Sequence, residues 1–151
     1  MKKITPYLWF QKELEKAIKL YTSLFPQSEI QFLSTIPNGA NEDNPITSSA
    51  FCLFNQEFFA LEGGPYYRFT PSLSLFVSCQ TPQEVEKYWE ALSLNGEILM
   101  DVGAYSFNPY YGWLNDQFGL SWQFALDELS EKITPFFMFS GVNFGKGKEA
   151  I

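Results

Sequence analysis

The chain has 151 residues, a length typical of one domain, of which 46% are hydrophobic and 19% aromatic. Ten basic against seventeen acidic residues give a net charge of −7, which repels phosphate backbones and anionic membrane surfaces and so argues against nucleic-acid and membrane binding. The sequence holds no histidine, so it lacks the usual general base of serine and cysteine triads and the commonest nitrogen ligand of metal sites.

The N-terminal residues run straight into a patterned segment, and no apolar stretch has the length of a signal sequence or a membrane span. Cys52 and Cys79 lie in strand-like apolar runs without the spacing of a metal site, which predicts small buried thiols. Both features favour a cytoplasmic protein with reduced cysteines.

The first half of the chain predicts one helix among four strands. The strand-like apolar runs are Ile4–Phe10, Glu29–Thr35, Thr47–Phe54 and Glu57–Gly63. An apolar stripe at helical spacing from Leu14 to Phe25 predicts an amphipathic helix that ends at Pro26. Pro37–Pro45 is rich in Asn, Gly and Asp, which predicts a mobile loop.

The same order of elements starts again in the second half. The strand-like runs are Ser72–Cys79, Glu97–Val102, Tyr110–Leu114 and Ser121–Leu126. Thr81 as N-cap, Pro82 at the first helical position and Glu84 in a capping box predict a helix that ends at Asn95-Gly96. Residues 4–63 and 72–126 therefore predict two βαβββ modules in an α+β fold, with curled mixed sheets around a cleft and helices outside.

Several motifs of this unit are similar to those of a known family. They are Ile4-Thr5-Pro6-Tyr7-Leu8-Trp9-Phe10, Leu61-Glu62-Gly63-Gly64-Pro65, Gly112-Trp113-Leu114 and Ser121-Trp122-Gln123. Over residues 3–127 the chain resembles the PhnB-like family, which carries the label of a 3-demethylubiquinone-9 3-methyltransferase domain. That family belongs to the vicinal oxygen chelate superfamily of glyoxalases, bleomycin resistance proteins and dioxygenases. The resemblance implies a glyoxalase-like domain at residues 1–127, but no particular reaction.

Enzymes of that superfamily hold a divalent metal with His and Glu side chains on the first and last strands of each module. The matching positions here provide only Glu62 and the neutral amide of Gln123, which is a poor oxygen ligand set, so no metal and no other cofactor is expected. A methyl donor usually docks on a glycine-rich turn between a strand and a helix. Gly63-Gly64-Pro65 leads instead into Tyr66-Tyr67 without a helical stripe.

The resemblance further implies that Glu62 and Gln123 face the groove between the curled sheets. The candidate ligand-binding residues are Tyr7, Trp9, Glu62, Trp113 and Gln123. Glu62 is also the candidate catalytic residue, because a carboxylate deep in a sheet needs a partner or a purpose. A salt bridge to Arg68, or capping of the Gly63-Gly64 turn, explains Glu62 equally well.

Two segments between the later strands have local interpretations. Asn115–Gly119 predicts a hairpin loop in which Asp116 has a turn role and Gly119 takes a positive φ. The aromatic run Tyr105–Trp113 suits either a lid over the cleft or a dimer contact.

The C-terminal residues repeat the beginning of the chain. Lys132-Ile133-Thr134-Pro135 matches Lys3-Ile4-Thr5-Pro6, and Glu149-Ala150-Ile151 resembles Lys16-Ala17-Ile18. We therefore expect residues 128–151 to be a linker plus the start of a second copy of the domain, either truncated or strand-exchanging. Its strand is expected to pair with a sheet edge in its own chain or in a partner.

The expected function is the metal-independent binding of a small molecule in a ring-lined cleft, by a cytoplasmic homodimer. Two alternatives stay open. One is an enzyme that uses Glu62 in a lyase, isomerase or dioxygenase-like reaction, or in the methyl transfer of the family label. The other is an association module without catalysis.

Overall fold

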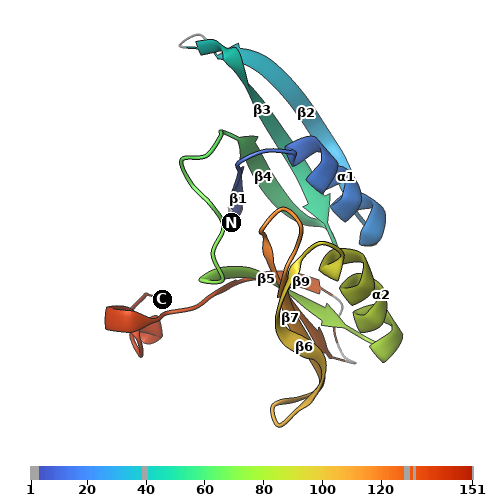
Figure 1. Cartoon of the computed structure of the whole chain (residues 1–151). Coiled ribbons are helices and arrows are strands. Elements are labelled where there is room, and N and C mark those ends of the chain that lie inside the picture. The colour runs from blue at the N-terminus through green and yellow to red at the C-terminus, as the bar shows by residue number, and fades with distance from the viewer. Residues whose placement is uncertain (1–3, 39–40, 128–129, 131, 151) are drawn as a thin grey trace. The chain divides into compact units, whose positions relative to one another are not determined.

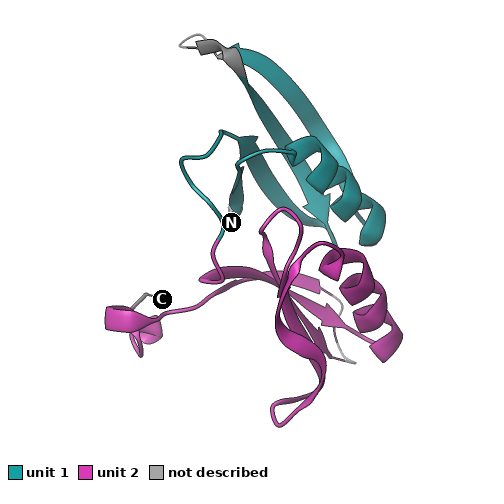
Figure 2. Ribbon diagram, in the orientation of Figure 1, with its two compact units in different colours: residues 1–69 teal, residues 70–151 magenta. Residues whose placement is uncertain are grey.

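The computed structural model describes residues 4–38, 41–127, 130 and 132–150 (Figure 1). These residues form two compact units, residues 1–69 and 70–151 (Figure 2). Each of the two predicted βαβββ modules lies within one unit, and each unit holds one mixed sheet and one α-helix, so the predicted α+β class is confirmed.

Unit 1 is a four-stranded sheet with one helix. Its elements are β1 (Tyr7–Phe10), α1 (Leu14–Leu24), β2 (Glu29–Asn38), β3 (Asn41–Leu53) and β4 (Gln56–Glu62). The strand order is β1-β4-β3-β2, in which β1 is parallel to β4 and the other neighbours are antiparallel. The first strand and the last strand of the module are therefore neighbours in space.

The apolar stripe of α1 is buried as the sequence predicts, with Leu14, Ala17, Ile18 and Tyr21 inside. The helix packs on β2, β3 and β4. The strand residues on the same face of the sheet are fully buried, which makes this face the core of unit 1; they are Leu8, Phe10, Phe51, Phe58 and Ala60.

The prediction of a loop at Pro37–Pro45 is wrong for the described part of that segment. β2 extends to Asn38 and β3 begins at Asn41, and the two strands pair there. The sheet tolerates Pro37 because β2 is an edge strand, where a missing N–H costs little, and because the ladder has a register shift between Ile36 and Asn38. Pro45 of β3 lies opposite the same shift and before Thr47, where the pairing of β3 with β4 begins.

Unit 2 is a five-stranded sheet with one α-helix. Its strands and α-helix are β5 (Leu73–Cys79), α2 (Pro82–Ser93), β6 (Glu97–Tyr105), β7 (Asn108–Asn115), β8 (Ser121–Leu126) and β9 (Lys132–Phe137). The strand order is β6-β7-β8-β5-β9, and β5 is parallel to β8 as β1 is to β4 in unit 1. The aromatic run Tyr105–Trp113 forms the end of β6, a short turn and most of β7.

The predicted capping box of α2 is present, with Thr81 accepting from Glu84 N and the Glu84 side chain accepting from Thr81 N. The buried stripe of α2 includes Tyr88 and Trp89, whose rings lie against Phe124 of β8. Gly112 of β7 permits this packing, because a Cβ there would overlap the Trp89 ring. The face of the sheet under α2 is the core of unit 2.

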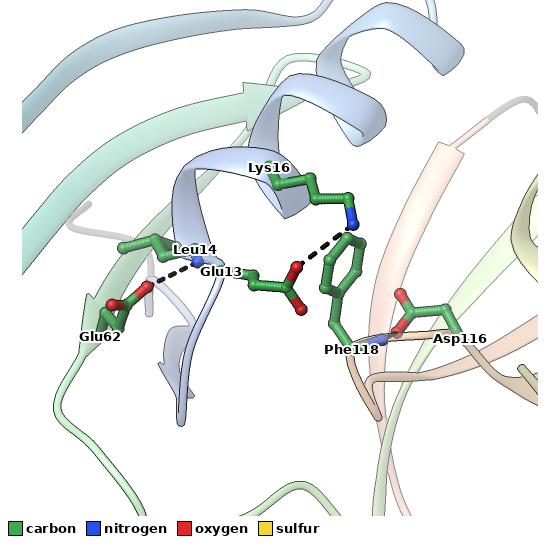
Figure 3. Close-up of polar contacts among 6 residues, drawn as sticks. All are labelled: Glu13, Leu14, Lys16, Glu62, Asp116 and Phe118. Carbon is green, nitrogen blue, oxygen red and sulfur yellow. Dashed lines mark hydrogen bonds and ion pairs between the residues drawn. The ribbon is translucent and has the colours of Figure 1, made fainter. Parts of the chain in front are cut away.

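The predicted hairpin loop between β7 and β8 is organised around Asp116 (Figure 3). Asp116 Oδ1 accepts from Phe118 N at 2.8 Å and from Leu120 N at 3.1 Å, while Oδ2 accepts from Trp122 Nε1 at 2.8 Å. Gly119 has φ 86°, the left-handed conformation that favours glycine. The predicted turn role of Asp116 is therefore confirmed.

The C-terminal strand β9 pairs antiparallel with β5 of the same unit, and Ile133 is buried. After β9 the chain makes two short 3-10 helices, η1 (Gly141–Asn143) and η2 (Gly147–Ala150). Residues 128, 129, 131 and 151 of the predicted linker and second copy lie outside the described residues, and a second domain stays a prediction.

Two sequence predictions concern the cysteines and the lack of a membrane-spanning segment. Cys52 and Cys79 are buried thiols, as predicted. No helix within the described ranges combines the length and the apolar character needed to cross a bilayer.

Candidate functional site

The five predicted site residues fall into two groups, one in each unit. Trp113 and Gln123 lie in the sheet of unit 2, whereas Tyr7, Trp9 and Glu62 lie in the sheet of unit 1.

Trp113 and Gln123 share one face of the second sheet. Along β8, Trp122 and Phe124 point toward α2, so the alternation of strand residues turns Gln123 to the opposite face. Gln123 is the direct cross-strand neighbour of Trp113 on β7 and of Phe76 on β5. The structure therefore brings together these two predicted residues on the face of the sheet opposite α2.

A buried hydrogen-bonded row crosses this face from β7 through β8 to β5. Tyr111 Oη donates to Gln123 Oε1 at 2.6 Å, and Gln123 Nε2 donates to Ser74 Oγ at 2.6 Å. Gln123 is 6% exposed and Ser74 0%. Beside the row, Trp113 Nε1 donates to Ser121 Oγ at 2.9 Å. All of these side chains are uncharged, so the face presents neutral donors and acceptors among rings.

Sequence reasoning missed Tyr111 and Ser74. The only signal for them was strand alternation, which places Tyr111 and Trp113 on one face of β7 and Ser74 and Phe76 on one face of β5. That signal does not show which residues of neighbouring strands meet, because the register of the sheet decides it.

Tyr111 is held as a neutral donor. Burial raises its pKa to about 12, with a further contribution from Tyr105. Its ring contacts Phe107 and Tyr105, with centroids 5.0 and 5.8 Å away. At neutral pH the phenol therefore donates to Gln123 and does not act as a general base.

Glu62 has a structural partner that sequence reasoning did not foresee (Figure 3). Its Oε2 accepts a 2.8 Å hydrogen bond from Leu14 N, the first residue of α1. Glu13, at the N-cap, has φ 61° and makes no side-chain capping bond, so Glu62 satisfies an amide that the helix start leaves open. The carboxylate also lies at the positive end of the helix dipole.

The structure places Glu62 within its own sheet, and its direction toward the predicted groove between the sheets stays a prediction. Glu62 lies on the face of the sheet that carries Phe58, Ala60 and α1, and not on the opposite face. Within the described residues it forms no ion pair with Arg68. It borders a surface hollow of about 510 Å³ that charged residues of the first turns of α1 also line, among them Glu15 and Lys19, which pair at 2.6 Å.

Tyr7 and Trp9 lie on the face opposite to Glu62, so the structure does not bring these three together. Trp9 Nε1 donates to Gly64 O at 3.0 Å, and the indole ring lies on Gly63, where a Cβ would overlap it. Tyr67 covers the ring edge-on at 5.1 Å between centroids. Trp9 therefore anchors the turn after β4, whereas Tyr7 is mostly exposed and contacts Phe59.

The residues of the polar row do not fit a divalent metal. Gln123 Oε1 already accepts from Tyr111, and the other donor atoms there are neutral hydroxyl and amide groups. A divalent ion of the superfamily needs carboxylate or imidazole ligands. Across the part of the chain that the structure describes, no three His, Cys, Asp or Glu side chains are close enough to hold a metal ion together.

The fold is similar to several solved structures. A PhnB protein from Bacillus cereus described as a putative 3-demethylubiquinone-9 3-methyltransferase matches with 39% identity and a TM-score of 0.77, over 83% of this chain and 100% of that chain. Protein PA1353 from Pseudomonas aeruginosa matches at 20% identity and a TM-score of 0.70, over 84% and 98%. The fosfomycin resistance protein FosX from Listeria monocytogenes, solved with Mn(II) and sulfate, matches at 16% identity and 0.57, over 86% and 95%.

The first of these three similarities extends to sequence, and the other two concern the fold alone. A search of curated proteins finds no match. The family model described as 3-demethylubiquinone-9 3-methyltransferase matches residues 2–125, which contain both βαβββ modules and leave β9 and the following residues outside. The chain therefore belongs to this PhnB-like family of the vicinal oxygen chelate superfamily.

Proposed function

We propose that this protein binds a small, uncharged organic molecule against the face of the second sheet opposite α2, without a metal ion. The row Tyr111–Gln123–Ser74 carries the proposal. It offers a phenol, an amide and a hydroxyl in one line, and Trp113 and Phe76 place rings beside it. A few convergent polar groups among aromatic rings are typical of small-molecule sites.

The polar row is costly as a purely structural feature. Burying amide and hydroxyl groups costs free energy unless each is hydrogen-bonded, and an apolar sheet face avoids that cost. Gln123 retains unused capacity, since its Oε1 has a second lone pair and its Nε2 a second proton. These directions suit a ligand that carries both a donor and an acceptor.

Neutral donors also specify the charge of the ligand. A free carboxylate or phosphate would bring a net charge to a row of neutral donors, in a chain of net charge −7. Lys132 of β9 is on the same face, but it pairs with Ser78, at the other end of β5 from Ser74. A ring-bearing neutral molecule with a carbonyl or hydroxyl group suits the face better. We further propose that binding occurs in the cytoplasm, where Cys52 and Cys79 stay reduced.

Native mass spectrometry of the freshly purified protein, without added metal, tests the proposal. We expect an organic adduct or a bare chain, and no divalent ion at one per chain. An organic adduct should be lost from Gln123→Ala but kept by Gln83→Ala, which removes an exposed amide on α2. One bound divalent ion per chain, or an adduct that Gln123→Ala retains fully, would contradict metal-independent binding at this row.

If the purified chain carries no organic adduct, candidate ligands are added to it. A thermal-shift screen of neutral ring compounds should then find some that raise Tm for the wild type and Gln83→Ala but not for Gln123→Ala. We do not propose the methyl transfer of the family label, since Gly63-Gly64 leads into a turn and a second strand, not into a helix that cradles a cofactor.

A further inference from the structure

The segment that runs from the end of β9 through the following residues exposes several large apolar side chains. Its exposed large apolar residues are Phe136, Phe137, Met138, Phe139, Val142 and Phe144. We call residues 136–144 the aromatic tail. It lies outside residues 2–125, the part that matches the family. Contiguous exposed apolar surface of this kind marks an interaction site.

The sequence repeat gives the aromatic tail a buried counterpart in the same chain. When Lys132-Ile133-Thr134-Pro135 is matched to Lys3-Ile4-Thr5-Pro6, Phe137 corresponds to Leu8 and Phe139 to Phe10. Leu8 and Phe10 of β1 are 1% and 0% exposed, whereas Phe137 and Phe139 are 65% and 40% exposed. The tail thus carries the apolar pattern of a core strand without a core to cover it.

The tail is also shaped to receive side chains. After β9 it folds back through η1 and η2 and leaves an apolar hollow of about 590 Å³. Pro135, Phe136, Phe137 and Phe139 form one side, and Gly145, Gly147 and Lys148 the other. An open hollow lined by rings favours the insertion of apolar groups from a second surface.

The distribution of charge along the chain indicates which second surface the tail binds. Three lysines and one glutamate give residues 132–151 a net charge of +2, so residues 1–131 carry −9 of the total of −7. The tail is therefore an apolar, basic segment on an acidic protein. Charge complementarity favours the body of another copy over a neutral protein, and disfavours contact of one tail with another.

We propose that the aromatic tail is the segment through which this chain binds the acidic body, residues 1–131, of a second copy. Two such contacts related by a twofold axis close a dimer. The aromatic rings supply the apolar contact, and Lys146 and Lys148 supply the attraction to the acidic body. The inference does not depend on the proposed ligand site.

The test is the molar mass of the full chain, measured by light scattering after gel filtration over a concentration series. We expect the wild type to have twice the mass of one chain. Phe137→Ser combined with Phe144→Ser should raise the dissociation constant by roughly a hundredfold, as expected for the loss of two aromatic anchors. Tyr66→Ser, which removes an exposed ring of unit 1, should leave it unchanged.

A charge reversal identifies the surface that the tail binds. Lys146→Glu with Lys148→Glu should weaken the dimer by at least about tenfold, because the tail then repels the acidic body. If two tails bound each other instead, this variant would not weaken the dimer. The net charge of each segment 132–151 would change from +2 to −2, so the repulsion between the two segments would stay the same. Circular dichroism should be that of the wild type for every variant, because all of these side chains are exposed.

Three outcomes overturn the proposal. The first is a wild type that stays monomeric at about 100 µM, a concentration far above ordinary dimer dissociation constants. The second is a dimer that the double serine variant does not weaken. The third is a monomer that co-floats with vesicles of anionic and neutral phospholipid, which would make a bilayer the partner of the tail.

Discussion

Replacing Glu62 separates its role in folding from a role in chemistry. Glu62 Oε2 lies 2.8 Å from Leu14 N and satisfies the first open amide of α1. Loss of a capping side chain costs about 0.5–2 kcal/mol, and loss of a carboxylate at a helix N-terminus about 0.3–1 kcal/mol. We therefore expect Glu62→Ala to lower the free energy of unfolding by about 1–2 kcal/mol. Glu62→Gln keeps an acceptor and should cost about 0.5 kcal/mol.

Urea denaturation followed by circular dichroism measures these changes, and hydrogen exchange locates them. Exchange should accelerate at the first amides of α1 in Glu62→Ala, while α2 in the other unit should be unaffected. Glu57→Ala is the matched control, since it removes an exposed carboxylate from the same strand. A Glu62→Ala protein as stable as Glu57→Ala, with unchanged exchange in α1, would refute the capping role and restore Glu62 as a candidate for catalysis.

Two further predictions concern unit 2. Asp116→Ala leaves three donors, among them the buried Trp122 Nε1, without their acceptor, and should cost about 3–5 kcal/mol in urea denaturation. Asp101→Ala, at an exposed aspartate of β6, should cost about 0.5 kcal/mol or less, and equal losses for the two would contradict the turn role. The pKa of Tyr111 is raised from 10.0 to about 12 in the folded protein, which makes the free energy of unfolding depend on pH. As the pH rises, the unfolded chain loses the phenolic proton first. The stabilisation by the protonated Tyr111 is therefore complete below pH 10 and is lost between pH 10 and about pH 12. Tyr111→Phe should remove up to about 2 kcal/mol of that decline, measured as the difference in unfolding free energy between pH 9 and pH 11.5, and parallel pH profiles for the two proteins would refute it.

In the proposed metal-independent binding, the neutral row on the second sheet takes the role that histidine-containing metal sites have in the superfamily. Superfamily metal sites need charged or imidazole ligands, and in this chain a glutamine and a serine on β8 and β5 bond to each other instead. The amide thereby has a defined orientation, because its oxygen accepts from Tyr111 and its nitrogen donates to Ser74. An oriented neutral amide is suited to recognise a ligand, not to activate water.

Local patterns in the sequence were sufficient for the helices and for one turn. The stripes of α1 and α2 follow from the 3.6-residue period, and the capping box of α2 involves residues only three apart. The side chain of Asp116 accepts from residues two, four and six positions further along the chain, so the hairpin also follows from a short segment. The order of strand, helix and three strands, which occurs twice, was enough for the α+β class, whereas the family followed from the resemblance of several short motifs.

Only the tertiary structure decided which residues meet across the sheets. Glu62 and Leu14 are 48 residues apart, and Gln123 and Ser74 are 49 apart, so no local pattern joins either pair. Alternation in β4 separates Glu62 from Leu61 but does not show which face α1 covers, so the contact of Glu62 with Leu14 N could not be predicted. Likewise, the pairing of β2 with β3 through the proline-containing segment, and of β9 with β5, depends on long-range ladders that form only when the sheet assembles.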